Sequence, residues 1–193
     1  MACSNNNAPV YAHDDPHAVI TTTREQLDDY YLITDPVGPA TRLYYTAIGY
    51  IEKKDGLEGA QDYHDAVETN IRQGAYKHRL AAITAAIRYA ENGTTYQYGI
   101  IHKRCPKGYR HQAGWCAATV QKNWDRYLTG GQCKNSKCTI KHKSATSHDT
   151  NVFIAYLGHV YCPIGADNDP DGLNKHWRKN VTYHYNLILT LSK

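Results

Sequence analysis

The residues of this 193-residue chain with the clearest chemical meaning are a cysteine at the start of an expected helix and a later histidine. Cys116 precedes an apolar helical pattern, and His159 follows it by 43 residues. A thiol at a helix N-terminus experiences the positive end of the helix dipole, which lowers its pKa and favours the thiolate nucleophile. His159 would be the base that accepts the proton. Gln112, four residues before Cys116, would donate a hydrogen bond to an oxyanion.

The third member of such a catalytic site would be a carboxylate that holds the imidazole in its working tautomer. Asp167, Asp169 and Asp171 follow His159 and are the candidates. The other interpretation is a structural one. In it Cys116 is a disulfide partner or a buried small residue, and His159 is a hydrogen-bonded histidine of a sheet.

A Gly-x-Cys that opens a helix, followed by a Gly-His, resembles the papain-like cysteine hydrolases in the broad sense. These include the NlpC/P60 amidases and compact papain-like bacterial effectors, and the resemblance covers residues 112–171. It implies Cys116 as nucleophile, His159 as base and Asp169 or Asp171 as third member. It also implies hydrolysis of an amide or isopeptide bond in a peptide-like or peptidoglycan-like substrate.

A calcium site is a second hypothesis for the acidic loop. Asp167, Asp169, Asp171 and Gly172 reproduce the start of an EF-hand loop, but Arg178 occupies the twelfth position, where a glutamate should stand. The sequence therefore predicts either a looser Ca²⁺-binding turn or an ordinary turn. The hydrolase chemistry itself requires no cofactor.

A zinc site is a further hypothesis, because Cys133, Cys138, His142 and His148 lie within sixteen residues. Their spacing matches no common zinc finger, and four lysines in the same stretch would repel a cation. A disulfide between Cys133 and Cys138 is at least as well supported.

The six cysteines and the first residues favour an exported protein, extracellular or periplasmic. Residues 1–7 resemble the mature end of a bacterial lipoprotein, with Cys3 as the lipid-anchored residue, and the chain as given shows no signal peptide. In an oxidising compartment the remaining candidates for disulfides are Cys105, Cys133, Cys138 and Cys162. No run of about 18 apolar residues predicts a membrane-spanning helix.

Charge is divided unevenly along the chain. Residues 1–70 hold 4 Lys or Arg and 12 Asp or Glu, whereas residues 71–193 hold 18 and 6. Ten basic residues and a single acid, Asp125, lie between residues 101 and 145. Either the acidic part folds over the basic part, or the basic part attracts an anionic polymer such as a nucleic acid or a glycan. A pI of about 8.6 is modest for a nucleic-acid-binding domain, so a nucleic-acid partner is not favoured.

The hydrophobic pattern predicts an α+β fold, with a mostly antiparallel sheet packed against one long helix and one shorter helix. The long helix spans residues 60–91 and is bent or divided at Gly74, the shorter one spans residues 116–128, and a capping pattern predicts a further short helix at 22–31. Alternating β-formers predict strands at residues 41–53, 94–102, 151–162 and 181–191. Residues 1–20 are expected to be an irregular arm, and residues 21–193 a single globular domain.

Three functions are consistent with these patterns. The first is an exported cysteine hydrolase. The second is a non-enzymatic secreted protein, stapled by disulfides and rich in tyrosine, with 17 Tyr against 1 Phe; it would self-associate or bind a surface partner. The third is a binder of an anionic polymer.

Overall fold

The computed structural model describes residues 38–91, 93–129, 150–164 and 172–193, and within these ranges the chain is helical, with no strand. The helices are α2 (Pro39–Asn70), α3 (Lys77–Ala90), α4 (Tyr109–Leu128), α5 (Thr150–Tyr161) and α6 (Asn174–Leu191). The predicted α+β class is therefore wrong. The expected helix at 22–31 lies outside the described residues.

The predicted strands at 41–53, 151–162 and 181–191 lie within helices, and 94–102 is part of a loop. In α6 the buried residues are Trp177, Val181, Tyr185 and Ile188, which follow one another at helical spacings of three and four. The residue that the strand pattern placed on the same face, Tyr183, is 63% exposed. Tyrosine and β-branched residues favour strands locally, and here helix packing overrides that preference.

The expected long helix at 60–91 is two helices. Asn70 ends α2 and Lys77 begins α3, and Gly74 lies between them with a φ of +140°, which a residue with a side chain rarely adopts. The expected helix at 116–128 forms the greater part of α4 and ends at the same residue, Leu128.

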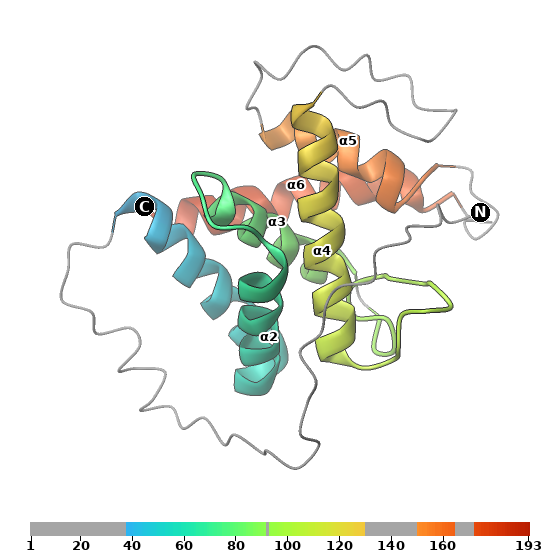
Figure 1. Cartoon of the computed structure of the whole chain (residues 1–193), viewed down its shortest axis with the longest axis horizontal. Helices are drawn as coiled ribbons and strands as arrows, with labels where there is room; N and C mark the ends of the chain where they lie inside the picture. The colour runs from blue at the N-terminus through green and yellow to red at the C-terminus, as the bar shows by residue number, and fades with distance from the viewer. Residues whose placement is uncertain (1–37, 92, 130–149, 165–171) are drawn as a thin grey trace.

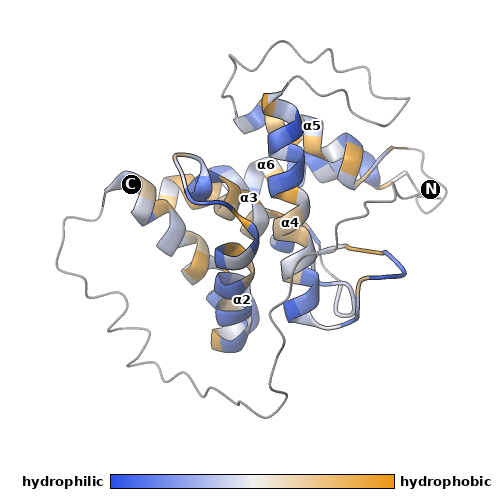
Figure 2. Ribbon diagram, viewed as in Figure 1, coloured by the Kyte–Doolittle hydropathy of each residue, from blue (hydrophilic) through white to orange (hydrophobic). Residues whose placement is uncertain are grey.

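Helix α3 is the central element of the fold. It packs against α2, α4 and α6, while α5 packs against α4 and α6 (Figure 1). Ala81, Ala82, Ile83, Ala85 and Ile87 are all at most 1% exposed, so the middle of α3 is enclosed on every side, although Arg79 near its start is exposed. The apolar stretches of the other helices turn toward this centre and the hydrophilic ones away from it (Figure 2).

Tyrosine hydroxyls join the helices and loops through main-chain carbonyl groups. The hydroxyl of Tyr63 in α2 donates to the carbonyl oxygen of Ala81 in α3 at 2.7 Å. The hydroxyl of Tyr89 donates to the carbonyl oxygen of Tyr50 at 2.8 Å, and that of Tyr161 donates to the carbonyl oxygen of Tyr98. These partners allow polar rings to be buried without a desolvation penalty.

A buried ion pair joins α2 to α3 beside a kink. Gly56 interrupts α2 with a φ of +77°, and the preceding Asp55 forms two bonds with Arg88, at 2.6 and 2.9 Å. The side chains of both residues are at most 10% exposed. This pair links the acid-rich first part of the chain to the base-rich second part, as the folding-over interpretation of the charge pattern expects.

In the part of the chain that the structure describes, no helix has the length and apolarity needed to span a membrane.

Candidate anion-binding site

Cys116, the expected nucleophile, lies inside the hydrophobic core. It is the eighth residue of α4 rather than the first, and its exposure is 0%. Burial raises the pKa of its thiol to about 12, although a hydrogen bond with Tyr161 acts in the opposite direction. A reactive cysteine needs solvent access and a lowered pKa, so these surroundings do not favour a thiolate at neutral pH.

His159, the expected base, lies in α5, two residues before Tyr161. Since Tyr161 faces Cys116 and residues i and i+2 of a helix point in different directions, His159 does not share that orientation. Asp167, Asp169 and Asp171 lie outside the described residues, as do Cys3, Cys133, Cys138, His142 and His148. The Cys-His-Asp site and the two metal sites therefore stay predictions.

The expected disulfides are wrong for the cysteines that the structure shows. Cys105, Cys116 and Cys162 are thiols and not halves of disulfides. Cys162 donates a hydrogen bond from Sγ to Oδ1 of Asn174 at 2.7 Å. A core of this size needs no covalent staple, and Cys116 packs there as a small apolar residue, which was the alternative interpretation.

Gln112, expected to bind an oxyanion, holds a loop in place instead. It is fully buried. Its Oε1 accepts a hydrogen bond from the amide of Ile100 at 3.1 Å. Its Nε2 donates to the carbonyl oxygen of Ile100 at 3.0 Å and to Sγ of Cys105 at 3.3 Å. Both donor hydrogens of the amide are therefore used, and the loop that precedes α4 is fixed to that helix.

Two turns give this loop its shape. The amide of Gly99 donates to the carbonyl oxygen of Tyr96 at 2.8 Å, with a φ of +70° at Gly99. The amide of Cys105 donates to the carbonyl oxygen of His102 at 2.9 Å, and the amide of Arg104 donates to Nδ1 of the same histidine at 3.2 Å. The loop lies at the end of α4 where that helix begins (Figure 1).

The second turn carries a group of cations that we call the basic loop, residues 101–107. Lys103, Arg104 and Lys107 are exposed, and none takes part in the ion pairs seen among the described residues. No acidic residue occurs between Glu91 and Asp125. In the described part of the chain no ion pair offsets these charges, so this surface is attractive to anions.

A hollow of about 310 Å³ lies against the basic loop. It is lined by Tyr96, Ile101, His102, Lys103, Cys105 and Lys107. The ring of His102 also stacks on Trp115 of α4, with centroids 5.3 Å apart and an angle of 28° between the planes. Apolar and strongly hydrophilic stretches are adjacent in this loop (Figure 2). The lining of the hollow therefore contains both aromatic rings and cationic side chains.

No negative charge enters the hollow from its own lining. Burial raises the pKa of the Cys105 thiol to about 11, so the thiol is neutral at physiological pH. At the adjoining end of α4, Gly108 provides no side-chain cap and the first turn has no acid. A bound anion would complement the positive end of that helix dipole.

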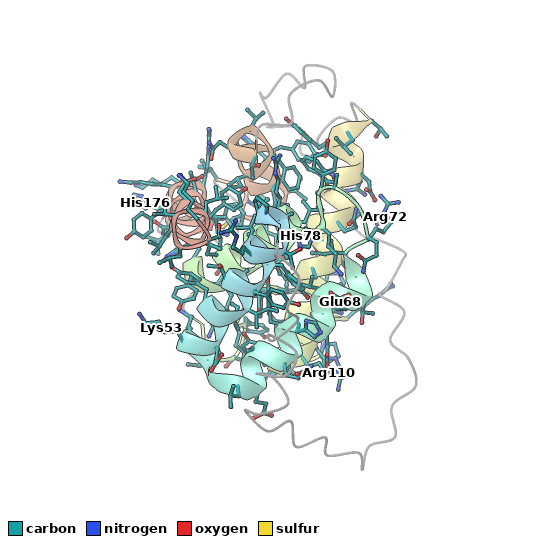
Figure 3. The ribbon with its side chains drawn as sticks, turned by 90° about the vertical axis from the view of Figure 1, so that its left-hand side faces the viewer. Lys53, Glu68, Arg72, His78, Arg110 and His176 are labelled. Atoms are coloured by element: carbon teal, nitrogen blue, oxygen red, sulfur yellow. The ribbon has the colours of Figure 1, made fainter. Side chains whose placement is uncertain are left out.

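Arg110 differs from the three cations of the basic loop. It lies at the start of α4, near α2 (Figure 3), and its charge partly opposes the burial that raises the pKa of Asp62. Because its charge interacts with a carboxyl group of α2, Arg110 is not counted in the anion site.

A second polar cluster lies between α2 and α3, where Glu68 and His78 are close together (Figure 3). The hydroxyl of Tyr44 is 2.9 Å from both Nδ1 of His64 and Oε1 of Glu68. Lys77, 6% exposed, donates to the two oxygens of Glu68 at 2.5 and 2.6 Å. Tyr44, Glu68 and Lys77 thus satisfy one another, whereas Nδ1 of His78 is buried without a hydrogen-bond partner. The bonds from Lys77 to Glu68 join α3 to α2.

The sequence analysis identified the basic run but missed Tyr96 and His102. The run of cations without acids is visible in the sequence. The side chains of Tyr96 and His102 lie beside these cations only because of two turns, and turns leave no periodic pattern in the sequence.

No protein-family model, curated protein or solved structure matches this chain. Its function must therefore be inferred from its own geometry.

Proposed function

We propose that the protein is a non-enzymatic binding protein whose ligand is a polyanion, held at the basic loop. The observation that carries this proposal is the hollow of about 310 Å³, whose lining contains two lysines and two rings but no carboxylate. Of the three functions that the sequence suggests, it is the one that this geometry supports best.

The charges of the basic loop are available to a ligand. Lys103, Arg104 and Lys107 lie within five residues and are exposed. Cations that neutralise successive charges of a polyanion release its counterions, which supplies binding free energy. The proposed affinity therefore depends strongly on salt concentration.

The loop is also held in one conformation. The amide of Gln112 binds it at Ile100 and Cys105, and the Arg104 amide fixes the ring of His102. A preorganised site loses less conformational entropy on binding.

The hydrolase hypothesis receives less support. It requires a thiolate that meets substrate, whereas the Cys116 thiol is fully buried and has a raised pKa.

The proposal is tested by titrating the protein into a labelled single-stranded oligonucleotide and into labelled heparin at several salt concentrations. We expect binding to at least one of them, with an affinity that falls as salt rises. In the double variant K103A/K107A the salt slope on a single strand should be lower by roughly 1.4, because each lost phosphate contact removes about 0.7.

The matched control is K175A/K179A, which removes two exposed charges from α6. It should leave the slope of the wild-type protein unchanged. If neither polyanion binds, or if the α6 variant loses binding while the loop variant retains it, the proposal is wrong.

A further inference from the structure

We infer that the hollow beside the basic loop receives an unpaired base, so that the polyanion is a single-stranded nucleic acid. This inference rests on the proposed binding of a polyanion at the same residues.

The first argument is the presence of rings in the lining. A polyanion recognised by charge alone needs no aromatic surface, yet Tyr96 and His102 both line the hollow. Proteins that bind single strands combine a basic surface with rings on which bases stack, because every base has a π face. Lys103 and Lys107, in the same lining, would contact the phosphates on either side of the base.

The second argument is the support given to His102. Its ring lies almost parallel to that of Trp115, and its Nδ1 accepts a hydrogen bond from the Arg104 amide. The imidazole is therefore held between a tryptophan and the hollow. A ring fixed in this way presents a ready surface for stacking, at little cost in conformational entropy.

The third argument is what the lining lacks. Sugar hydroxyls are both donors and acceptors, and carboxylate and amide side chains can accept several of their hydrogen bonds at once. The side chains that line this hollow include no Asp, Glu, Asn or Gln, and the Nδ1 acceptor of His102 is already occupied. Stacking on a base requires no such acceptor, so this lining favours a nucleic acid over an anionic glycan.

The fourth argument is size and shape. A volume of about 310 Å³ is at the lower end of the range for small-molecule pockets, about 300 to 1,000 Å³. That is suited to one exposed nucleotide. Double-stranded DNA is read by an element that protrudes into a groove, whereas a hollow requires the base to leave the stack.

One tryptophan provides a direct readout. Trp124 and Trp177 are each 5% exposed, whereas Trp115 is only partly buried and lies beneath His102. Stacking of a base at this place should therefore quench chiefly the fluorescence of Trp115. The variant W115F identifies the part of the quenching that belongs to this residue.

The test compares an oligothymidylate with an abasic strand of the same length and charge, using the full chain. At equal salt we expect the oligothymidylate to bind roughly tenfold more tightly, given the usual contribution of stacking. The two strands should show the same salt slope. Heparin serves as the glycan probe, and it should bind no more tightly than the abasic strand.

Variants of the rings complete the experiment. H102A should lower the affinity for oligothymidylate more than that for the abasic strand, so that the ratio of the two affinities falls toward one. H102F restores a ring and should restore most of the affinity. Far-UV circular dichroism and thermal unfolding of each variant establish that it is folded.

The two proposals fail in different ways. Equal binding of the oligothymidylate and the abasic strand overturns the base-binding inference while polyanion binding stands. Tighter binding of heparin than of the oligothymidylate also overturns it and identifies a glycan instead. If none of the three probes binds, the proposed function itself is wrong.

Discussion

The thiol of Cys116 illustrates how burial decides the chemistry of a single residue. Its pKa is raised to about 12, chiefly by desolvation. We expect Cys116 to resist iodoacetamide in the native protein at neutral pH and to react once urea unfolds the chain. Peptide mass mapping of both samples measures this, with the half-buried Cys162 as the internal comparison. Rapid labelling of Cys116 in the native protein would contradict its placement and revive the hydrolase hypothesis.

Residues of the candidate site differ in how well the sequence predicts them. Lys103, Arg104 and Lys107 stand out because no acid interrupts their run. The sequence also singles out Gln112, as a donor to an oxyanion. Its hydrogen bonds instead hold the loop at Ile100, twelve residues away. Side-chain-to-backbone contacts of this kind leave no periodic pattern, so a sequence pattern cannot specify them.

At the level of elements, the junction of α2 and α3 depends on a buried charge pair. In D55A the guanidinium of Arg88 keeps its acceptors at the carbonyls of Glu91 and Gln97 but loses its carboxylate. We expect a cost of about 3–5 kcal/mol in the free energy of unfolding, because an unpaired buried charge remains. Urea titration followed by circular dichroism measures it.

The exposed pair of Arg72 and Asp125 provides the matched control. Its side chains are 70% and 38% exposed, so D125A should cost less than about 1 kcal/mol. Similar costs for D55A and D125A would show that the Asp55–Arg88 pair does not have the role assigned to it.

The contact of α2 with α4 makes stability depend on pH through Asp62. Its pKa is raised to about 6, first by burial and then by Glu58 and Asp65, while Arg110 and His111 act in the opposite direction. In an unfolded chain the value is about 3.9. The folded state thus binds this proton more tightly, and the resulting stabilisation is complete below about pH 4 and is lost as pH rises through about 6.

The variant D62N removes this titration. It should be more stable than the wild-type protein at pH 7, and the two should have the same melting temperature near pH 4. Thermal unfolding of both proteins between pH 4 and pH 7 measures how the difference in their melting temperatures changes with pH. A difference that does not change with pH would argue against Asp62 as the group responsible.

The sequence predicted where helices stop better than it predicted which segments are helical. The ends at Leu128 and near Glu91, and the break at Gly74, follow from local breakers that act in any fold. The strand predictions were wrong because Tyr, Val and Ile residues fit both the two-residue period of a strand and the 3.6-residue period of a helix. Only tertiary packing shows that Val181, Tyr185 and Ile188 share one face of a helix. The choice between sheet and helix was therefore a property of the packed molecule.

For the molecule as a whole, the overall charge conceals how charge is arranged. Asp55 and Glu68 of α2 are each paired with a base of α3, and Asp62 is near Arg110. Among the described residues these acids face bases at the helix contacts, and none forms an ion pair with the basic loop. A pI of about 8.6 averages over both regions, which is why it disfavoured the nucleic-acid ligand that we propose for the local surface.

The tyrosine hydroxyls that bind main-chain carbonyls also limit how the helices can move. Aliphatic layers can shear past one another, because one methyl group replaces another at little cost. Here a slip of α3 along α2 by a single residue would separate Tyr63 from the carbonyl of Ala81 and Tyr89 from that of Tyr50. The interior therefore fixes one register of α3 against α2, and adaptation to a ligand is left to exposed side chains such as those of the basic loop.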